Sequence, residues 1–380
     1  MKRENQRFYK LLFISFLLVL TVITVVNLLI PDQTYSETEN RMLAERPVLT
    51  AAGFLDGRYP KKYEKYTTDQ FAFRPFWVEV KTTVDRLVGK NYSNGVYYGD
   101  QQYLLEDIAV PDPDSLANKI SAMNEFAARY PQIRSAVMLV PDAANVLRDY
   151  LPPYAPVKDQ DAFIGQVKDS LSPAVAFVDV KGALQRDSVN PMYYKTDHHW
   201  TTQGAYDAFR QLAPVLSLDP DAVAYDSYPV TNEFIGSLAS KSGYYLNNGD
   251  TISVFLPKEP LDYVVTYVEE KQKTATFYEE SKLEIKDKYE VFFGGNHPLV
   301  QIESTADPNR KLLLIKDSYA NCFAPFLAPY FGEITMLDPR YYTGNIEELM
   351  QTGNYTDLLF LYNANTFFQD SSLETVLSPE

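Results

Sequence analysis

The sequence predicts a three-layer α/β protein, in which helices cover both faces of a parallel β-sheet, behind an apolar N-terminal helix. Two observations predict the sheet. Short continuous apolar runs, which strands buried on both faces require, recur between residues 134 and 363. Helical periodicity fills segments between these runs, as in parallel sheets. A third observation predicts the N-terminal helix: residues 11–30 contain no charged side chain, and at about 1.5 Å per residue they can cross a hydrocarbon core of ~30 Å.

The apolar segment 11–30 is expected to be an uncleaved signal anchor. Residues 1–10 carry four basic side chains against one acidic side chain, so the positive-inside rule predicts a cytoplasmic tail at 1–10. A cleaved secretory signal is the alternative, but its apolar region runs roughly 7–15 residues and ends in small residues. We therefore expect a single-pass protein of the cytoplasmic membrane whose main domain is extracytoplasmic.

Composition narrows the class of ligand. The net charge of -15 argues against nucleic acid or anionic lipid as the main ligand, because those depend on clustered basic residues. Cys322 is the single cysteine, so no intrachain disulfide can form and packing must supply the stability. The 29 tyrosines and 22 phenylalanines suit either a large core or the stacking of sugar rings.

The distribution of polar and apolar residues divides the chain into a stem and one large domain. Residues 31–90 are polar and amphipathic, with breaks at Pro47 and Pro75, and are expected to form a stem and helical linker. The α/β domain is expected at 91–380, with a β-rich insertion at about 225–309 that is marked by Gly, Asn and Asp. Its predicted buried strands are SAVMLVPD (135–142), AVAFVDV (174–180), KLLLIKDS (311–318), EITMLDP (333–339) and DLLFLYN (357–363).

Polar side chains stand at the carboxyl ends of these predicted strands. In parallel α/β sheets, ligands bind at this edge. The sequence therefore predicts a ligand site there, near Asp142, Asp317, Ser318, Asp338 and Asn363.

The segment TDHHWTTQGAY (196–206) contains two of the three histidines of the chain. It precedes an amphipathic helix that Thr201 or Thr202 can cap, so the motif lies on a loop. Side chains at i and i+2 of an extended loop point the same way, so Asp197 can accept a hydrogen bond from one nitrogen of His199 and leave the other free. His198 is then expected to point elsewhere. This pair is the acid and base half of a hydrolase triad.

Ser318 is the best candidate for the nucleophile of such a triad. It follows a buried-type strand directly and precedes a helical-looking segment. In that position the hydroxyl stands at the carboxyl edge of the sheet, and the Ser318 N–H faces a developing oxyanion.

Four motifs together resemble one known family. TDHHWTTQGAY, FFGGNHP, IKDSYANCFAPFL and DPRYY, preceded by the stem segment ENRMLAERP, resemble the DHHW family, an SGNH-hydrolase-like family related to the alginate O-acetyltransferases. The resemblance implies an SGNH-type fold, with Asp197 as the orienting acid, His199 as the general base and Ser318 as the nucleophile. Two departures stand out: Lys316 occupies a place where many SGNH enzymes have glycine, and the acid and histidine precede the serine.

The resemblance also implies a function. It predicts serine-dependent transfer of an acyl group, in particular acetyl, to a cell-surface polysaccharide, or removal of that group by an esterase. A membrane-bound O-acyltransferase is the expected partner that supplies the acyl group, and no cofactor is expected. The runner-up is a catalytically inactive polysaccharide-binding or scaffold protein of the same fold. A distance of ~3 Å between Ser318 Oγ and a ring nitrogen of His199 separates the two hypotheses.

Four further residues are candidates for the oxyanion hole or for substrate binding. Asn296 follows two glycines that let backbone and amide groups approach a substrate, although a simple turn explains the same pattern. Asn321 lies three residues after Ser318 and either faces the same pocket or is exposed. Arg340 either holds a substrate group or forms a structural ion pair. Trp200 either forms a wall for a sugar ring or packs the loop.

A metal site is the remaining hypothesis. Asp197, His198 and His199 offer ligand atoms, and Asp317 is a distant carboxylate that can join them. Adjacent histidines diverge, however, and no H-x-x-x-H pair exists in the sequence. We therefore expect no metal.

Overall fold

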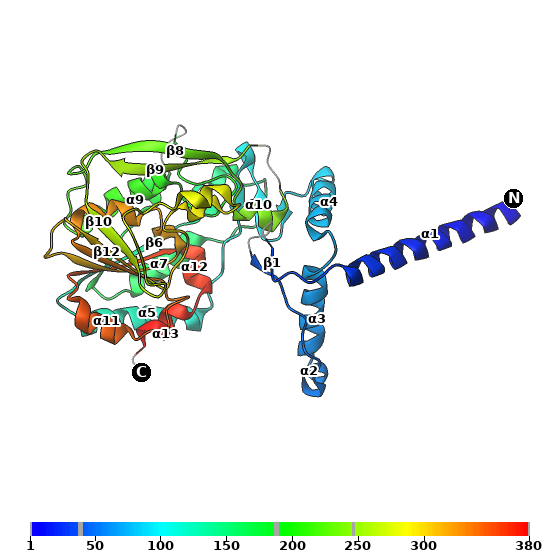
Figure 1. Cartoon of the computed structure of the whole chain (residues 1–380), viewed down its shortest axis with the longest axis horizontal. Helices are drawn as coiled ribbons and strands as arrows, with labels where there is room; N and C mark the ends of the chain where they lie inside the picture. Colours follow the sequence, from blue (N-terminus) through cyan, green and yellow to red (C-terminus); the bar gives the residue numbers. More distant parts are fainter. Residues whose placement is uncertain (1, 37–40, 186–189, 245–247, 379–380) are drawn as a thin grey trace. The chain divides into compact units, whose positions relative to one another are not determined.

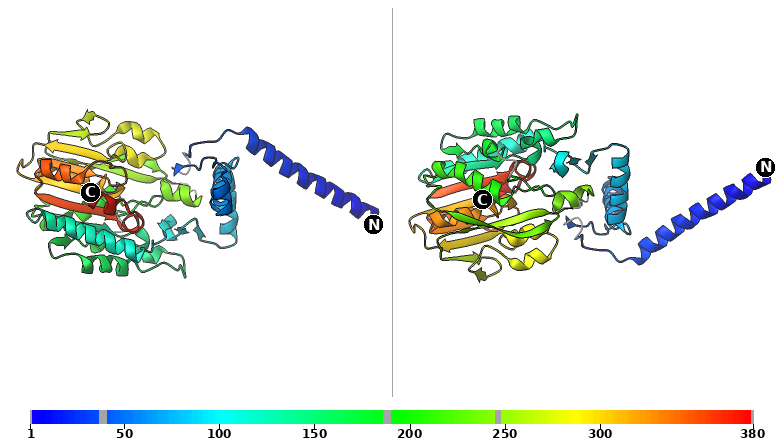
Figure 2. Two further views of the ribbon diagram at one scale, coloured as in Figure 1. Left: turned by 90° about the horizontal axis from the view of Figure 1, so that it is seen from below. Right: turned by 90° about the horizontal axis from the view of Figure 1, so that it is seen from above.

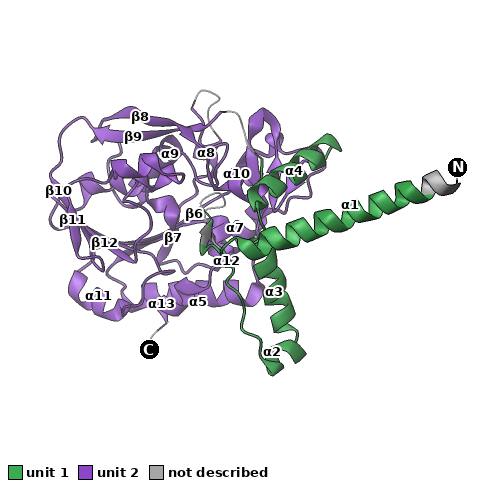
Figure 3. Ribbon diagram, turned by 45° about the vertical axis from the view of Figure 1, so that its right-hand side comes forward, with its two compact units in different colours: residues 1–90, 243–245 green, residues 91–242, 246–380 purple. Residues whose placement is uncertain are grey.

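The computed structural model describes residues 2–36, 41–185, 190–244 and 248–378. Two compact units make up this chain (Figure 3). The smaller unit comprises residues 1–90 with 243–245, and the larger unit comprises 91–242 with 246–380.

The smaller unit begins with helix α1 (Lys2–Leu29). Within the described part of the chain, Gln6–Leu29 is the one helical segment that is long and apolar enough to cross a membrane, with a mean hydropathy of 2.7. Its polar side chains bond back to the helix itself: Thr21 and Thr24 donate to the carbonyls of Leu17 and Leu20, each at 2.8 Å. Satisfied polar groups of this kind are what a helix surrounded by lipid requires.

The stem consists of short elements after α1. The strands β1 (Tyr35–Ser36) and β2 (Arg41–Met42) pair antiparallel, and three helices follow, α2 (Ala51–Leu55), α3 (Arg58–Asp69) and α4 (Arg74–Leu87). Pro75 lies in the first turn of α4, where its missing N–H costs nothing, so it begins this helix and does not break it.

An eight-stranded sheet forms the centre of the larger unit, in the order β11-β10-β12-β14-β13-β15-β6-β7 (Figure 1). Neighbours from β14 to β7 pair in parallel. These five strands coincide with the five apolar runs of the sequence, so the predicted parallel sheet is confirmed. Their bounds are β6 (Arg134–Val140), β7 (Val175–Phe177), β13 (Lys311–Lys316), β14 (Glu333–Leu337) and β15 (Asp357–Asn363).

Alternate side chains of the parallel strands enter two separate hydrophobic cores. In β13, Leu312 and Leu314 belong to the core on one face, whereas Leu313 and Ile315 belong to the core on the other face. Helix α9 (Thr202–Val215) covers the first face, and α5 (Pro113–Arg129), α11 (Ile346–Gly353) and α13 (Ser372–Leu377) cover the second (Figure 1). The fold thus has the three layers that continuous apolarity predicts.

The strands of the segment 225–309 take two different places. β8 (Tyr225–Phe234) and β9 (Asp250–Pro257) form an antiparallel ribbon of their own. β10 (Tyr263–Tyr267), β11 (Gln272–Thr274) and β12 (Leu299–Ser304) pair antiparallel with one another, and β12 pairs antiparallel with β14, so they extend the central sheet.

Shorter elements complete the larger unit. A small antiparallel sheet contains β3 (Tyr92–Ser93), β4 (Val96–Tyr98) and β5 (Leu104–Glu106). The remaining helices are α6 (Ala143–Val146), α7 (Gln160–Ser170), α8 (Lys181–Leu184), α10 (Ser237–Ser242) and α12 (Ala364–Gln369).

Polar side chains meet at the carboxyl edge of the parallel strands. Asp142 after β6 accepts a hydrogen bond from Asn363 Nδ2 at the end of β15, at 3.0 Å. Asp317 after β13 accepts a hydrogen bond from the Asn363 N–H at 2.9 Å. The same edge carries Ser318, as parallel strand topology requires.

Candidate active site

The loop that carries the DHHW motif is closed by backbone and carboxylate contacts. Tyr193 and Trp200 form an isolated antiparallel bridge around it, and Thr201 caps α9 by accepting a hydrogen bond from Gly204 N–H at 3.1 Å. The Asp250 carboxylate accepts hydrogen bonds from the Lys195 N–H (2.9 Å) and the Thr196 N–H (2.8 Å). The position of the motif is therefore fixed from both sides.

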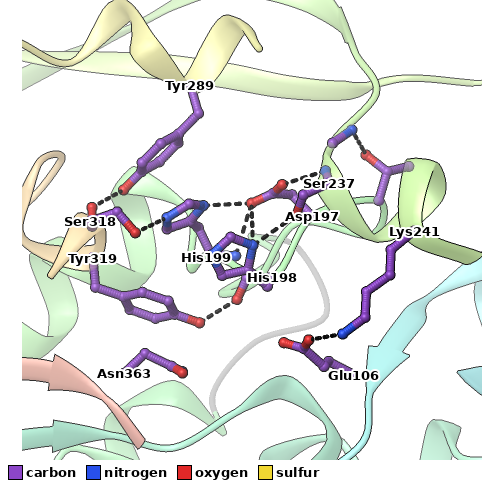
Figure 4. A network of polar contacts seen from close by, with 12 residues as sticks. Glu106, Asp197, His198, His199, Ser237, Lys241, Tyr289, Ser318, Tyr319 and Asn363 are labelled. Atoms are coloured by element: carbon purple, nitrogen blue, oxygen red, sulfur yellow. Dashed lines mark hydrogen bonds and ion pairs between the residues drawn. The ribbon is translucent and has the colours of Figure 1, made fainter. Parts of the chain in front are cut away.

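Asp197 is buried, and its carboxylate is hydrogen-bonded on both oxygens (Figure 4). Oδ1 accepts the His199 N–H at 3.0 Å and lies 2.5 Å from His199 Nδ1. Oδ2 accepts the Ser237 N–H at 2.7 Å. Because the carboxylate holds Nδ1–H, the Nε2 atom of His199 is left as a hydrogen-bond acceptor.

The free nitrogen of His199 faces Ser318. His199 Nε2 and Ser318 Oγ lie 2.8 Å apart, although 119 residues separate them in the chain. The Tyr289 ring stacks on the His199 ring, with centroids 3.9 Å apart and an angle of 13° between the planes. The Tyr289 hydroxyl donates to the Ser318 carbonyl at 3.2 Å. Tyr289 therefore contacts both residues of the pair.

Ser318 opens the short 3-10 turn Ser318–Ala320 directly after β13. Asp317 stabilises this turn by accepting the Tyr319 N–H at 2.9 Å. Ser318 itself is partly exposed. Among the described residues its N–H has no hydrogen-bond partner, so it is available to a negative charge that develops beside Oγ.

The electrostatics keep Asp197 charged and His199 neutral. Burial by itself raises the pKa of the Asp197 carboxyl, but the His198 and His199 rings and the hydrogen bonds outweigh burial and hold that pKa well below its usual value. Burial, and after it the His198 ring, lowers the pKa of His199 to about 4, although Asp197 acts in the opposite direction. At neutral pH the His199 imidazole is thus able to accept the Ser318 proton.

The expectation that His198 points elsewhere is wrong. Its ring lies beside the His199 ring, with centroids 3.9 Å apart, and its Nδ1 contacts Ser237 Oγ at 2.8 Å. His198 Nδ1 is also only 3.6 Å from Asp197 Oδ1. Because the Tyr193–Trp200 bridge closes the loop into a turn, successive side chains do not alternate as they do in an extended segment.

Three residues of the motif carry atoms that can bind a metal ion. Asp197, His198 and His199 offer ligand atoms within 4.8 Å of one another. Ligand atoms on a tetrahedral zinc ion lie about 3.3 Å apart. The 2.5 Å between Asp197 Oδ1 and His199 Nδ1 fits a shared proton better than a shared ion.

A buried polar cluster lies beside the Ser318 turn and includes two predicted site residues. Lys316, which is 1% exposed, contacts Asn321 Oδ1 at 2.9 Å and Asn296 Oδ1 at 3.4 Å. Asn321 Nδ2 donates to Asn296 Oδ1 and to the Gly295 carbonyl. The Asn321 amide is thereby satisfied inside the cluster, so its predicted role as an oxyanion donor is not supported, while Asn296 remains exposed at the border of the cluster.

Arg340 and Trp200 take the structural alternatives that the sequence left open. Arg340 forms a bidentate ion pair with Asp338, through Nε at 2.9 Å and Nη2 at 2.6 Å. Trp200 is 0% exposed, stacks on Phe323 and donates its Nε1–H to the Tyr319 carbonyl at 3.0 Å. A substrate-binding role is therefore wrong for Trp200, because no face of its ring is open to a ligand.

Several residues of the site escape sequence reasoning. Tyr289, Ser237 and Asp250 have no motif of their own. Tyr289 reaches His199, Ser237 reaches Asp197, and Asp250 holds the backbone before the motif only because distant segments converge. Gly236 lies against Asp197: a Cβ atom there would stand 2.3 Å from Asp197 Cβ. A glycine in a loop gives little signal of such contact without the structure.

The comparisons with known proteins identify the family. The family described as SGNH hydrolase-like domain, acetyltransferase AlgX, matches residues 87–288, more than half of the chain. The chain belongs to this family. The match includes the DHHW loop and ends before Ser318. No curated protein matches the sequence.

Solved structures agree with the family. A DHHW family protein from Eubacterium siraeum superposes with a TM-score of 0.64 at 23% identity, over 76% of this chain and 98% of its own. Bacillus cereus PatB1 superposes with a TM-score of 0.60 at 20% identity, over 72% of this chain and 97% of its own. The predicted SGNH-like fold and the DHHW resemblance are both confirmed.

Gly236→Ala tests the packing behind Asp197 in this SGNH-like site. The new Cβ would overlap Asp197, whose position the loop fixes, so we expect a loss of about 1–3 kcal/mol in the free energy of unfolding. Gly165→Ala is the matched control, because no atom lies within 4 Å of the added Cβ in α7. It should leave stability unchanged or raise it by about 0.4–1 kcal/mol. Urea unfolding followed by near-UV circular dichroism measures both, and equal effects would contradict the packing argument.

Proposed function

We propose that this protein is an extracytoplasmic, serine-dependent O-acyltransferase, with acetyl as the expected acyl group, and that it acts on a cell-surface polysaccharide. The observation that carries the proposal is the distance of 2.8 Å between Ser318 Oγ and His199 Nε2, with Asp197 on the opposite side of the imidazole. Membership of a family described as acetyltransferase supports the reaction class. Esterase activity is the same chemistry with water as the acceptor.

The first half-reaction forms an acyl-enzyme. His199 Nε2 takes the proton of Ser318 while Oγ attacks the acyl carbonyl, and the Asp197 carboxylate stabilises the imidazolium that forms. The Ser318 N–H donates a hydrogen bond to the oxyanion of the tetrahedral intermediate. The ester bond of the donor then breaks, and the leaving oxygen takes the proton from His199.

The second half-reaction transfers the acyl group. A sugar hydroxyl gives its proton to His199 Nε2 and attacks the acyl carbonyl of Ser318. The bond between Oγ and the acyl carbon breaks, and Ser318 recovers its proton. The same geometry serves both steps, because donor and acceptor oxygens occupy the same side of the imidazole in turn.

The proposal also includes a location in the membrane and a partner protein. Residues 11–30, of which all but the last lie within α1, would anchor the chain in the cytoplasmic membrane with the N-terminus inside. An acyl donor outside the membrane must be exported, and a membrane-bound O-acyltransferase is the partner that we propose supplies it.

A catalytically inactive binding protein of this fold is the alternative. It requires no alignment between Ser318 and His199, and a serine sealed under side chains would favour it. The hydrogen-bond distance between the two residues and the partial exposure of Ser318 favour the enzyme.

Removal of the nucleophile or the base tests the proposal. Ser318→Ala and His199→Ala should each lower turnover of a small acetyl ester by at least about 10³-fold, with circular dichroism unchanged. Ser227→Ala removes an exposed hydroxyl from β8 and should keep wild-type turnover.

Covalent labelling adds a second readout of the same chemistry. A sulfonyl fluoride should add one sulfonyl group to the wild type and none to Ser318→Ala, as read by intact-mass spectrometry. Bacillus cereus PatB1 has been solved with a sulfonyl adduct. Full turnover in both Ser318→Ala and His199→Ala would end the enzyme hypothesis.

The pH dependence follows from the lowered pKa of His199. Protonated His199 cannot accept the Ser318 proton, so activity is present above the pKa of His199 and is lost as the pH falls through about 4. We expect kcat/KM for a small ester to keep its plateau well below pH 6.5, the ordinary value of a histidine. Circular dichroism at each pH controls for acid unfolding. An acid limb with its midpoint at or above 6.5 would contradict the neutral, buried imidazole.

A further inference from the structure

One face of helix α4 in the stem is apolar and exposed. Phe73, at the start of the helix, and five residues that follow at helical spacing form this stem face, and each side chain is between 37% and 82% exposed. Their spacing of three and four residues aligns them in one stripe along the helix. The members of the stem face are Phe73, Phe76, Trp77, Val80, Val84 and Leu87.

The opposite side of α4 is already packed. Val78 and Thr82 lie so close to Gly243 that a Cβ atom there would come within 2.7 Å and 2.9 Å of them. The Arg86 guanidinium lies over the Tyr244 ring, 5.9 Å from its centroid. These contacts hold α4 with its apolar stripe outward, so the exposure of the stem face is a fixed property of the stem.

The beginning of the stem face lies beside the end of α1. Asn27 Oδ1, in the last turn of α1, accepts the Ala72 N–H at 2.8 Å, one residue before Phe73. The Gln70 side chain exchanges two hydrogen bonds with the Gln33 backbone, at 2.9 Å and 3.0 Å. Helices α3 and α4 run across the direction of α1 (Figures 1 and 2). A helix that crosses the membrane at α1 would thus bring α4 to the level where the apolar segment ends.

We propose that α4 lies in the lipid–water interface beside the end of α1, with the stem face inserted among lipid acyl chains. This inference rests on the proposed membrane anchor. Trp and Phe rings are enriched at that depth of a bilayer, and amphipathic helices bury such a stripe in the interface plane. Lys81 flanks the stripe and pairs with Asp85 at 3.1 Å, so its ammonium stays on the polar side of α4 while its aliphatic chain lies along the apolar side. The hydrogen bond between Asn27 and Ala72 keeps the start of the stem face beside the end of the apolar segment, so lipid is the apolar partner that the proposed anchor brings to it.

Tryptophan fluorescence can locate this face, because the chain contains only Trp77 and Trp200. The full-length protein is reconstituted in phosphatidylcholine vesicles with or without bromine atoms near the top of the acyl chains. Trp200 is fully buried in the larger unit and is shielded from bromine. We expect brominated lipid to quench the wild type and to leave Trp77→Phe unquenched.

Two charge variants sharpen the test. Val84→Glu places a charge in the middle of the stem face and should reduce quenching of Trp77 at least several-fold. Ser227→Glu adds the same charge at an exposed position of β8 in the larger unit, outside α4, and should keep wild-type quenching.

The possible outcomes distinguish the interfacial placement of α4 from the membrane anchor on which it rests. Flotation of the wild type with the vesicles, without quenching of Trp77, would overturn the interfacial placement and leave the anchor standing. Trp77 emission that depends on protein density and is indifferent to bromine would assign the face to a second copy and also overturn it. Loss of flotation would contradict the anchor itself, and sulfonyl labelling of Ser318 reads the proposed chemistry independently of all three.

Discussion

The buried carboxylate of Asp197 is the interaction on which the site depends. A charge removed from water is costly unless hydrogen bonds and opposite charge replace the solvent. Here the Ser237 N–H, the His199 N–H and His199 Nδ1 surround it. The need to bring these groups together fixes the loop, requires a glycine at Gly236, and sets the direction of the His199 ring towards Ser318.

Aromatic polar groups hold the DHHW loop and the serine turn at one spacing. Trp200 donates to the Tyr319 carbonyl, and the Tyr319 hydroxyl donates to the His198 carbonyl. Tyr289 joins His199 to the Ser318 turn from a third segment. Buried Tyr and Trp commonly satisfy their polar ends in this way. Trp200, Tyr319 and Tyr289 therefore align the loops of the site.

The buried charges beside the turn explain the departure at Lys316. Its ammonium lies 3.5 Å from the Asp338 carboxylate, which also binds Arg340. Burial lowers the pKa of Lys316, and Asp338 opposes that shift. A glycine at this position would leave Asn321 and Asp338 without this cation. Lys316 and Arg340 thus both hold the Asp338 carboxylate at the sheet edge.

The sequence by itself determined the five buried strands, the candidate pair Asp197 and His199, and Ser318 at a strand end, because apolar runs, the short Asp-x-His motif and the residue that follows a strand are local patterns. Only the tertiary structure decided that β12 joins the sheet antiparallel, that the His198 ring lies against the His199 ring, and that the Trp200 side chain is fully buried. Those outcomes depend on contacts between segments far apart in the chain. No periodicity within a single segment records which distant side chain will occupy the space beside it.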